Sequence, residues 1–381
     1  MQTRVFHSIE QCGADEWDAL SDGANPFVSH AFLHALEASG SVSDSSGWRP
    51  SLITLSDSQG LAAAAPAYLK MHSYGEFVFD FSWAQAYARA GLDYYPKLTI
   101  AAPFTPAGGP RLLVRADLPP AQTRAALSAA IVDFVDARQL SSAHALFTSE
   151  VDQAALETEG WLARRDCQFH WRNRGYQSFD DFLGEFTADK RKKAKRERRR
   201  VAESGIHFET RAGHELSDAE LAAMYALHRD TFVRHGHEPY LTLAFFEIAR
   251  RSFGHQLMVK FAMFGQRVVA VAIFFVGRET LYGRYWGAAA DFHSLHFETC
   301  YHQGVEYCIE HGLARFEPGT QGEHKVSRGF EPTTTTSAHW IREPRFRAAI
   351  ADYLRRESRS VDEYSAAVER HVPFREESRQ R

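Results

Sequence analysis

The spacing of hydrophobic positions along this chain changes between a helical period and short extended runs, and the same order of elements occurs twice. In the first half the spacing predicts a helix, several strands, a longer helix, a strand, a short helix and a final strand. These elements cover residues 25–39, 50–56, 61–69, 97–102, 111–114, 120–139, 143–147, 153–159 and 161–171. Leu127, Ile131, Phe134 and Val135 form one apolar face of the longer helix, which predicts a helix with one buried side.

The second half repeats this order with negligible sequence identity to the first. Its predicted helices cover 179–203, 218–235, 243–252 and 297–311, and its predicted strands cover 255–264, 267–277, 280–287, 313–316 and 335–341. The run VVAVAIFFV is apolar on both faces, which predicts a central strand. The repeat predicts an α/β protein with mixed sheets and two successive domains, 1–172 and 173–343. In the charged tail, 344–381, an amphipathic helix is expected to pack against the body.

Composition agrees with two globular domains. The chain has 381 residues, of which 44% are hydrophobic and 24% charged. No apolar run has the length of a signal peptide or a membrane helix, so we expect a cytoplasmic protein. The cysteines have no metal-type or redox-type spacing, which favours reduced, packed side chains, at Cys12, Cys167, Cys300 and Cys308.

Charge is distributed unevenly between the halves. Residues 1–170 carry 11 Lys and Arg against 19 Asp and Glu, a net charge of −8, and the remainder carries 33 against 29, a net charge of +4. Nine of the twelve residues 189–200 are basic. This run is either a solvated helix face or a strip that attracts the phosphates of tRNA or of a nucleotide-linked or lipid-linked acceptor. The candidate nucleic-acid contacts are Lys190, Arg191, Lys192, Lys193, Lys195 and Arg196.

Polar side chains crowd the segment that follows the predicted strand 313–316. They are Glu317, Gln321, Glu323, His324, Lys325 and Arg328. Open α/β sheets bind ligands at strand ends, so we expect the chemistry here. Glu317, Glu323 and His324 are candidate bases, and Lys325 and Arg328 could hold an anionic group. For His324 the alternative is an ordinary surface role.

Six sequence motifs give this chain a resemblance, over nearly its whole length, to the predicted N-acyltransferase branch of the FemAB-like proteins. They are GRYWG, LHFETCYHQG, FEPGTQGEHK and RGFEP, together with HSYGEFVFD and AAPFTPAGGPRLL. The resemblance implies two GNAT-type folds in tandem. It also implies that an acyl group lies in a gap between two parallel strands, with a main-chain N–H of the fourth strand polarising its carbonyl. Those strands here are 280–287 and 313–317, with substrate walls formed by Arg284, Tyr285 and Trp286 on one side and 317–325 on the other.

Amide formation needs an activated acyl donor, an amine, a proton acceptor and oxyanion donors, and it needs no covalent intermediate and no cofactor. The loops GAAADFHSLHFE and FTPAGGPRLLVRADLPP lack the glycine pattern with which coenzyme-A-dependent relatives hold a pyrophosphate. The FemAB-like aminoacyltransferases, which take their donor from aminoacyl-tRNA, also lack this pattern. The resemblance therefore favours aminoacyl-tRNA as donor, followed by a long acyl thioester, and an amine-bearing small molecule or cell-wall-type acceptor. A non-catalytic RNA-binding module on the same fold is a further alternative.

Several other polar groups have a structural and a functional interpretation. Tyr74, Glu76, Asp80 and Arg111 are candidate acceptor contacts, or they belong to a tight turn with packed aromatics. Glu298 and His302 are spaced as a helix-stabilising pair, which is the interpretation we prefer. The group His235, His237 and Glu238 lacks further ligands nearby, so we predict no metal site.

Overall fold

The computed structural model describes residues 1–290, 294–320 and 322–376. These residues divide into two compact units. Unit 1 consists of Met1–Asp166 and Thr334–Glu363, and unit 2 consists of Cys167–Thr333 and the chain from Tyr364 onward. The chain changes unit within β9 (Leu162–Arg172), β15 (Glu331–Ile341) and α12 (Pro344–Glu369). Both units therefore combine two chain segments, whereas the ranges predicted from sequence, 1–172, 173–343 and 344–381, are each continuous.

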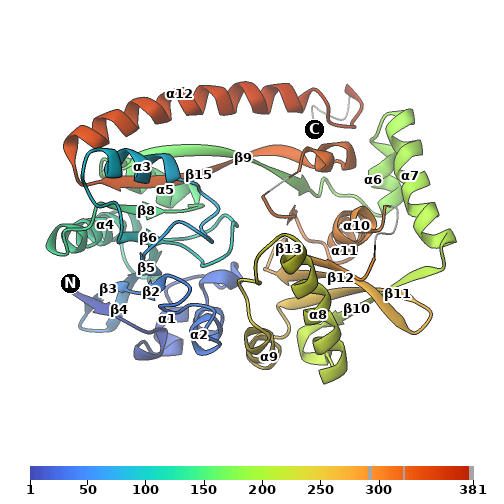
Figure 1. Cartoon of the computed structure of the whole chain (residues 1–381), viewed down its shortest axis with the longest axis horizontal. Coiled ribbons are helices and arrows are strands. Elements are labelled where there is room, and N and C mark those ends of the chain that lie inside the picture. The colour runs from blue at the N-terminus through green and yellow to red at the C-terminus, as the bar shows by residue number, and fades with distance from the viewer. Residues whose placement is uncertain (291–293, 321, 377–381) are drawn as a thin grey trace. The chain divides into compact units, whose positions relative to one another are not determined.

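Unit 1 contains two groups of paired strands (Figure 1). One has the order β1-β3-β4-β7 and is antiparallel, with β1 (Gln2–Phe6), β3 (Leu52–Asp57), β4 (Gly60–Ala65) and β7 (Leu113–Val114). The other has the order β15-β8-β6-β5-β2, with β2 (Trp48–Pro50), β5 (Ala67–Lys70), β6 (Lys97–Ile100) and β8 (Ser142–Ala145). β6 and β8 are parallel, whereas β15 with β8, β6 with β5 and β5 with β2 are antiparallel. The helices are α1 (Ala14–Asp18), α2 (His30–Ala38), α3 (Phe81–Arg89), α4 (Pro120–Ala137) and α5 (Glu150–Thr158).

The core of unit 1 forms where α4 packs on β3 and β4. A proline at the first position starts α4, where its missing N–H has no helical partner to lose. The predicted face is buried at Leu127, Ile131 and Val135, and it meets the small side chains of β4. Burying each such side chain stabilises the fold by about 1.5–3 kcal/mol. In α12 the expected apolar side is also confirmed, because Ile350 and Leu354 are buried against α3.

Unit 2 has the strand order β10-β11-β12-β13-β14-β9. The strands are β10 (Ile206–Ala212), β11 (Leu257–Phe264), β12 (Arg267–Val276), β13 (Thr280–Ala288) and β14 (Arg315–Glu317). Its helices are α6 (Phe179–Gly184), α7 (Ala188–Glu203), α8 (Asp218–Arg234), α9 (Leu243–Ser252), α10 (Leu295–Phe297), the π-helix η4 (Glu298–His302), α11 (Gln303–Glu310) and the 3₁₀-helix η5 (Glu323–Arg328). The apolar run VVAVAIFFV lies in β12, between β11 and β13, which confirms the predicted central strand.

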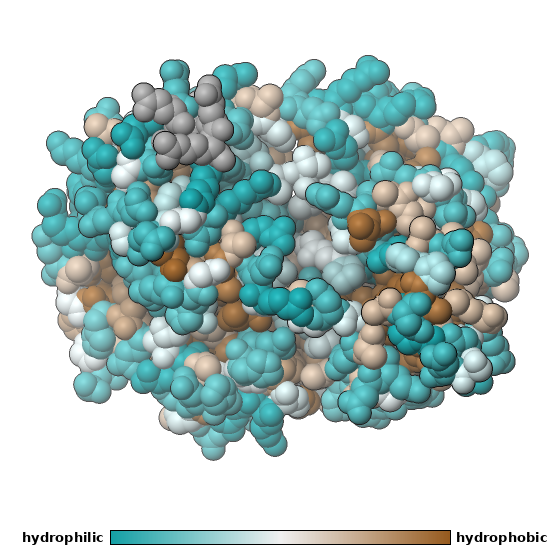
Figure 2. All heavy atoms as spheres, turned by 180° about the vertical axis from the view of Figure 1, so that it is seen from behind, coloured by the Kyte–Doolittle hydropathy of each residue, from teal (hydrophilic) through white to brown (hydrophobic). Residues whose placement is uncertain are grey.

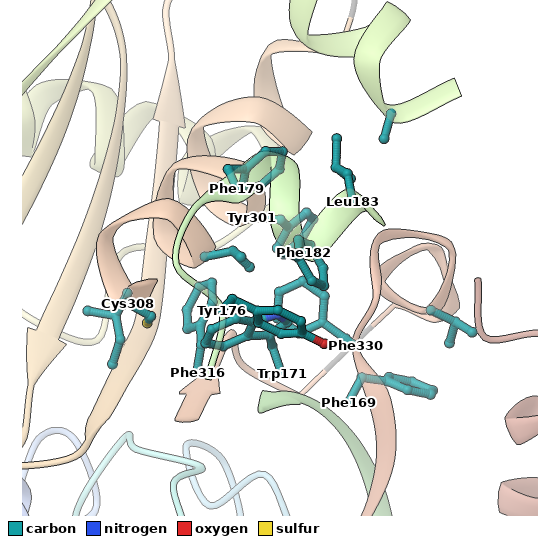
Figure 3. Close-up of a cluster of buried hydrophobic side chains, with 14 of the residues drawn as sticks. Phe169, Trp171, Tyr176, Phe179, Phe182, Leu183, Tyr301, Cys308, Phe316 and Phe330 are labelled. Atoms are coloured by element: carbon teal, nitrogen blue, oxygen red, sulfur yellow. The ribbon is translucent and has the colours of Figure 1, made fainter. Parts of the chain in front are cut away.

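Helix α8 approaches β13 closely because residue 287 is glycine. A Cβ at Gly287 would lie 2.4 Å from the main chain of Leu227 on α8, so any side chain would push the helix away. Neighbouring β13 residues turn to different partners: the ring of Tyr285 meets His228 on α8, and the ring of Trp286 meets His296 on α10. The aromatic core of unit 2 gathers side chains from β9, α6, β14 and the η4 helix (Figure 3).

Several elements differ from the sequence-based expectation. The predicted helix 179–203 is two helices, because Phe186 pairs with Phe374 and the N–H of Thr187 bonds the carbonyl of Pro373. The predicted helix 297–311 contains the π-helical turn η4. Strand β10 and helix α3 were not predicted from the spacing.

No helix in the described part of the chain combines the length and the apolar character needed to cross a bilayer. The face drawn in Figure 2 is covered mainly by hydrophilic side chains, with small hydrophobic patches between them.

Candidate active site

The pairing of the parallel strands β13 and β14 ends at their carboxyl ends. They pair from Thr280 with Arg315 to Tyr282 with Glu317, and β13 then continues to Ala288 beyond the end of β14. The register of β13 with β12 also shifts at Arg284, which marks a β-bulge. Bulges redirect a strand and its side chains locally, and they are common next to active sites.

A pocket of about 110 Å³ lies beside β13 beyond the end of this pairing. Its lining includes Arg284, Tyr285, Trp286, His296, Cys300, Tyr301 and Pro318. The structure thus brings together the three predicted β13 residues, Arg284, Tyr285 and Trp286. A second cavity, of about 390 Å³, shares Trp286 and His296 with the first and also meets Arg234 and His235 at the end of α8. We call the smaller space the acyl pocket and the larger one the vestibule.

His324 lies behind the acyl pocket and reaches it through Tyr301. Its Nε2 atom is 2.9 Å from the Tyr301 hydroxyl oxygen, and Tyr301 lines the pocket. Burial, with the nearby charges of Lys325 and Arg328, lowers the pKa of His324, so its imidazole is neutral at pH 7. Burial raises the pKa of Tyr301, so its hydroxyl remains protonated. A protonated hydroxyl bonded to a neutral imidazole can pass a proton on.

The two predicted cations of this segment are directed at protein groups. Lys325 is 1% exposed, donates to the carbonyl of Gly319 at 2.7 Å, and has its pKa lowered by burial to about 7. Arg328 stacks over Phe297, with its guanidinium carbon 3.5 Å from the ring centroid. Its Nη1 donates to the carbonyl of His324 at 2.7 Å, and its Nη2 donates to Glu197 at 2.9 Å. Arg328 therefore fixes the main chain that carries His324.

The remaining residues predicted at this strand end are more scattered. Glu323 is exposed and accepts a hydrogen bond from the Tyr364 hydroxyl at 2.8 Å. Glu317 ends β14 and is partly buried. Gln321 lies outside the described residues.

The sequence matches the model of a known protein family. The model of the FemAB-like family, described as peptidoglycan biosynthesis/recognition, matches residues 8–376. The chain belongs to the FemAB-like family. No curated protein matches its sequence significantly.

Solved structures confirm the predicted fold class for this FemAB-like protein, an α/β chain of tandem GNAT-type folds. FemX is similar with a TM-score of 0.55 at 10% identity, over 92% of this chain and 100% of FemX. The C-terminal domain of a putative lysylphosphatidylglycerol synthetase from Agrobacterium fabrum is similar with a TM-score of 0.52 at 9% identity, over 91% of this chain and 95% of that one. L-PGS from Bacillus licheniformis has a TM-score of 0.50 at 11% identity, over 93% and 99%. At these identities the likeness establishes the fold.

The FemAB-like protein buries three of the four candidate acceptor residues of unit 1, Glu76, Asp80 and Arg111. Glu76 and Asp80 both pair with Lys97, whose Nζ is 2.8 Å from Glu76 Oε2. Tyr74, by contrast, is 64% exposed. The Arg111 guanidinium is buried and donates to the carbonyls of Leu146, Pro110 and Ala107 at 2.7–2.9 Å. The polar groups of Glu76, Asp80 and Arg111 are thus directed at other protein groups, and the acceptor-binding role of the four residues stays a prediction.

Three residues of the acyl pocket were absent from the sequence-based candidates. His296, Cys300 and Tyr301 come from α10 and η4, and spacing alone assigns Tyr301 to the helix core. Burial lowers the pKa of His296 to about 4, so this ring is neutral as well. The sequence feature that could have indicated these residues is the number of polar side chains in LHFETCYHQG, which is unusual for a helix that only packs against a core.

The preferred helix-stabilising pair of Glu298 and His302 is replaced by other contacts. Both side chains are buried, and Glu298 Oε1 accepts from Arg198 at 3.1 Å and from Gln303 at 2.9 Å. His302 lies 3.8 Å from Glu197 on α7. The η4 helix is thus tied to the basic helix.

Five of the six candidate nucleic-acid contacts on α7 are exposed, and Arg191 is half-buried. Lys195 forms an exposed ion pair with Asp180 at 2.8 Å. No group of three metal-binding side chains occurs in residues 1–290, 294–320 and 322–376. None of the four cysteines, all of them described, forms a disulfide.

Proposed function

We propose that this FemAB-like protein is an N-acyltransferase that joins a small aminoacyl group, carried as an ester by tRNA, to an amine. The acceptor is an amine-bearing small molecule or a cell-wall precursor, in keeping with the peptidoglycan description of the family. Aminoacyl-tRNA is made in the cytoplasm, so the reaction belongs there. The observation that carries the proposal is the acyl pocket beside β13 beyond its pairing with β14, with the Tyr301–His324 pair at its wall.

The pair supports a proton relay. The acceptor amine attacks the ester carbonyl, forming the C–N bond, and a main-chain N–H of β13 stabilises the oxyanion. The amine proton passes to the Tyr301 oxygen while the hydroxyl proton of Tyr301 passes to His324 Nε2, which is 2.9 Å away. The carbon–oxygen bond to the ribose then breaks, and the imidazolium returns its proton through Tyr301 to the leaving oxygen. The products are an amide and a free tRNA hydroxyl.

Pocket size supports a small acyl group. The acyl pocket has about 110 Å³, which is less than the roughly 150 Å³ cavity that holds a benzene molecule. A glycyl- or alanyl-sized group fits such a space, whereas a long acyl chain does not. This argues for the aminoacyl ester over the long acyl thioester.

The exposed cations of α7 support an RNA carrier. Lys190, Lys192, Lys193 and Arg196 lie on its exposed surface within two turns. A strip of this kind attracts a phosphate backbone and releases counterions when it binds. The strip and the acyl pocket belong to the same unit.

The test is direct. The protein is incubated with labelled aminoacyl-tRNA pools and, separately, with labelled acyl-CoA pools in the presence of amine acceptors, and consumption of each donor is measured. We expect aminoacyl-tRNA alone to be consumed. Consumption of acyl-CoA instead would replace the donor, and consumption of neither would favour the non-catalytic RNA-binding module.

The carrier has its own test. Replacing Lys190, Lys192, Lys193 and Arg196 by Gln should weaken tRNA binding and lower its salt slope by roughly 0.9 for each lost duplex phosphate contact. Folding stability should barely change, since these side chains are exposed. Absence of tRNA binding by the unaltered protein at low salt would contradict the RNA carrier.

A further inference from the structure

A third cavity of unit 2 lies beside the basic helix α7. It has about 460 Å³, lies among α6, α7, β10 and η4, and shares no lining residue with the acyl pocket. Its apolar walls are Phe179, Leu183, Ile206 and Phe208. A space of this size with apolar walls and a few fixed polar groups is typical of a small-molecule site. The proposed transfer makes no use of it.

One buried carboxylate oxygen in the lining is unsatisfied. Glu298 is 3% exposed, and its Oε1 accepts from Arg198 and Gln303. Its Oε2 has no hydrogen-bond partner in the part of the chain that the structure describes. Leaving a buried carboxylate oxygen unpaired is unfavourable, and a donor N–H from a ligand would remove that penalty. The π-helical turn that carries Glu298 is itself a feature common at functional sites.

The rim of the cavity supplies exposed positive charge. Lys195 and Arg199 line the cavity, and their side chains are 54% and 68% exposed. Their partners, Asp180 and Glu203, are exposed as well. Exposed ion pairs contribute little stability, so both cations can turn to a bound anion.

We propose that this cavity, the base pocket, binds a nucleotide whose base carries an exocyclic amino group. The base lies against the apolar walls, its amino group donates to Glu298 Oε2, and its phosphate meets Lys195 and Arg199. Adenine and cytosine have such a donor, whereas hypoxanthine and uracil present a carbonyl at that position, which the carboxylate would repel. Proteins commonly read single-stranded RNA by such contacts to splayed bases. The inference rests on the proposed RNA carrier, whose single-stranded 3′ end supplies nucleotides of this kind.

Calorimetry on the full chain tests the base pocket with free nucleotides. We expect AMP to bind roughly 10- to 100-fold more tightly than IMP, because IMP lacks the N–H donated to a charged acceptor. CMP should likewise bind more tightly than UMP. Adenosine should bind more weakly than AMP, with a difference that shrinks as salt is added. Equal binding of AMP and IMP, or binding of neither, overturns the proposal.

A matched pair of variants on α7 locates the binding. Ala202 is exposed and lines the cavity, so Ala202→Trp should fill it and abolish AMP binding. Ala188 is exposed on the same helix and does not line it, so Ala188→Trp should bind AMP as the unaltered protein does. Glu298→Gln should remove the preference for AMP over IMP. AMP binding that survives Ala202→Trp, in a variant with a native circular dichroism spectrum, overturns the assignment.

Two further measurements separate this site from the proposed transfer. Competition of bound AMP by an RNA minihelix with a single-stranded CCA end identifies RNA as the source of the nucleotide, and AMP binding without competition identifies a free nucleotide. Nucleotide binding in a protein that transfers no aminoacyl group would retain the base pocket and contradict the transfer. Native transfer kinetics from aminoacyl-tRNA in Ala202→Trp, together with no AMP binding by the unaltered protein, would contradict the base pocket and retain the proposed transfer.

Discussion

The two units each contain a parallel pair of short strands, but the pairs differ beyond their carboxyl ends. In unit 1, β6 and β8 stay together after the strands end: the N–H of Leu146 bonds the carbonyl of Ile100, and Gly109 bridges Thr148. The buried Arg111 guanidinium bonds the carbonyls that follow. In unit 2, the pairing of β13 with β14 ends after three residue pairs, and the acyl pocket lies beside β13 beyond that point.

The difference shows how one architecture serves two purposes. An arginine with several donors satisfies loop carbonyls in unit 1 and makes that strand end a packed, rigid region. At the corresponding place unit 2 has a small space with a tyrosine and histidines beside it. We therefore propose that the chemistry belongs to unit 2 and that the strand end of unit 1 has a supporting role.

The largest expected effect is at the relay of unit 2. His324→Ala should reduce turnover ~10²- to 10⁴-fold, the usual contribution of a positioned acid–base group, and Tyr301→Phe should have a comparable effect because it interrupts the same path. Rates under saturating substrates provide the measurement. His207→Ala, at an exposed histidine of β10, is the control. Full activity in both relay variants would show that the chemistry does not take place at this strand end.

The next effect concerns the closed strand end of unit 1. Arg111→Ala removes the guanidinium donor from two buried carbonyls and one partly buried carbonyl, and it should lower the free energy of unfolding by about 3 kcal/mol. Urea unfolding followed by fluorescence measures it. A raised KM for the acceptor with native stability would instead favour the acceptor-binding role expected from the sequence.

A smaller effect is the pH dependence of unit 2. His324 must be neutral to accept a proton, and its pKa lies below the ordinary value of 6.5. The value of kcat/KM should therefore be flat from about pH 7 down to that lowered pKa and fall about tenfold per unit below it. Lys325, with a pKa of about 7, titrates nearby, so the profile is repeated in Lys325→Met. If the fall of kcat/KM at low pH persists in His324→Ala, the titration belongs to another group.

The smallest expected effect concerns the number of donor molecules bound by the chain, for which we expect no second site. Because the strand end of unit 1 is closed, the chain should bind one donor. Calorimetry with a non-hydrolysable aminoacyl-RNA analogue gives the stoichiometry. Two equivalent sites would break the contrast between the units.

Structural features that depend on residues close together along the chain can be predicted from the sequence. Helix α4 and strand β12 follow from spacing, because their burial repeats with the period of one element. The break between α6 and α7 does not, because Phe374, far along the chain, decides it. The same holds for Glu76 and Asp80, whose polar character predicts exposure until Lys97 is known to lie between them.

The candidate site was predicted in part for the same reason. Arg284, Tyr285 and Trp286 lie on one strand, so a correct strand prediction places them together. Tyr301 reaches the pocket from a π-helical turn, and a regular period cannot reveal that turn. His324 became a candidate because polar residues cluster after β14, although its contact with Tyr301 could be seen only in three dimensions.

The exchange of chain between the units within β9, β15 and α12 has a consequence for biosynthesis. Strand β8 pairs with β15 through Ala145 and Ala338, about 190 residues apart. At roughly 5–20 residues per second, a ribosome needs on the order of 10–40 s to make the second strand after the first. Unit 1 therefore cannot complete its sheet as an early folding intermediate, and β8 must wait with one edge open. Its sequence, Ser-Ala-His-Ala, is short and lacks bulky apolar side chains, which makes it a poor template for aggregation during that delay.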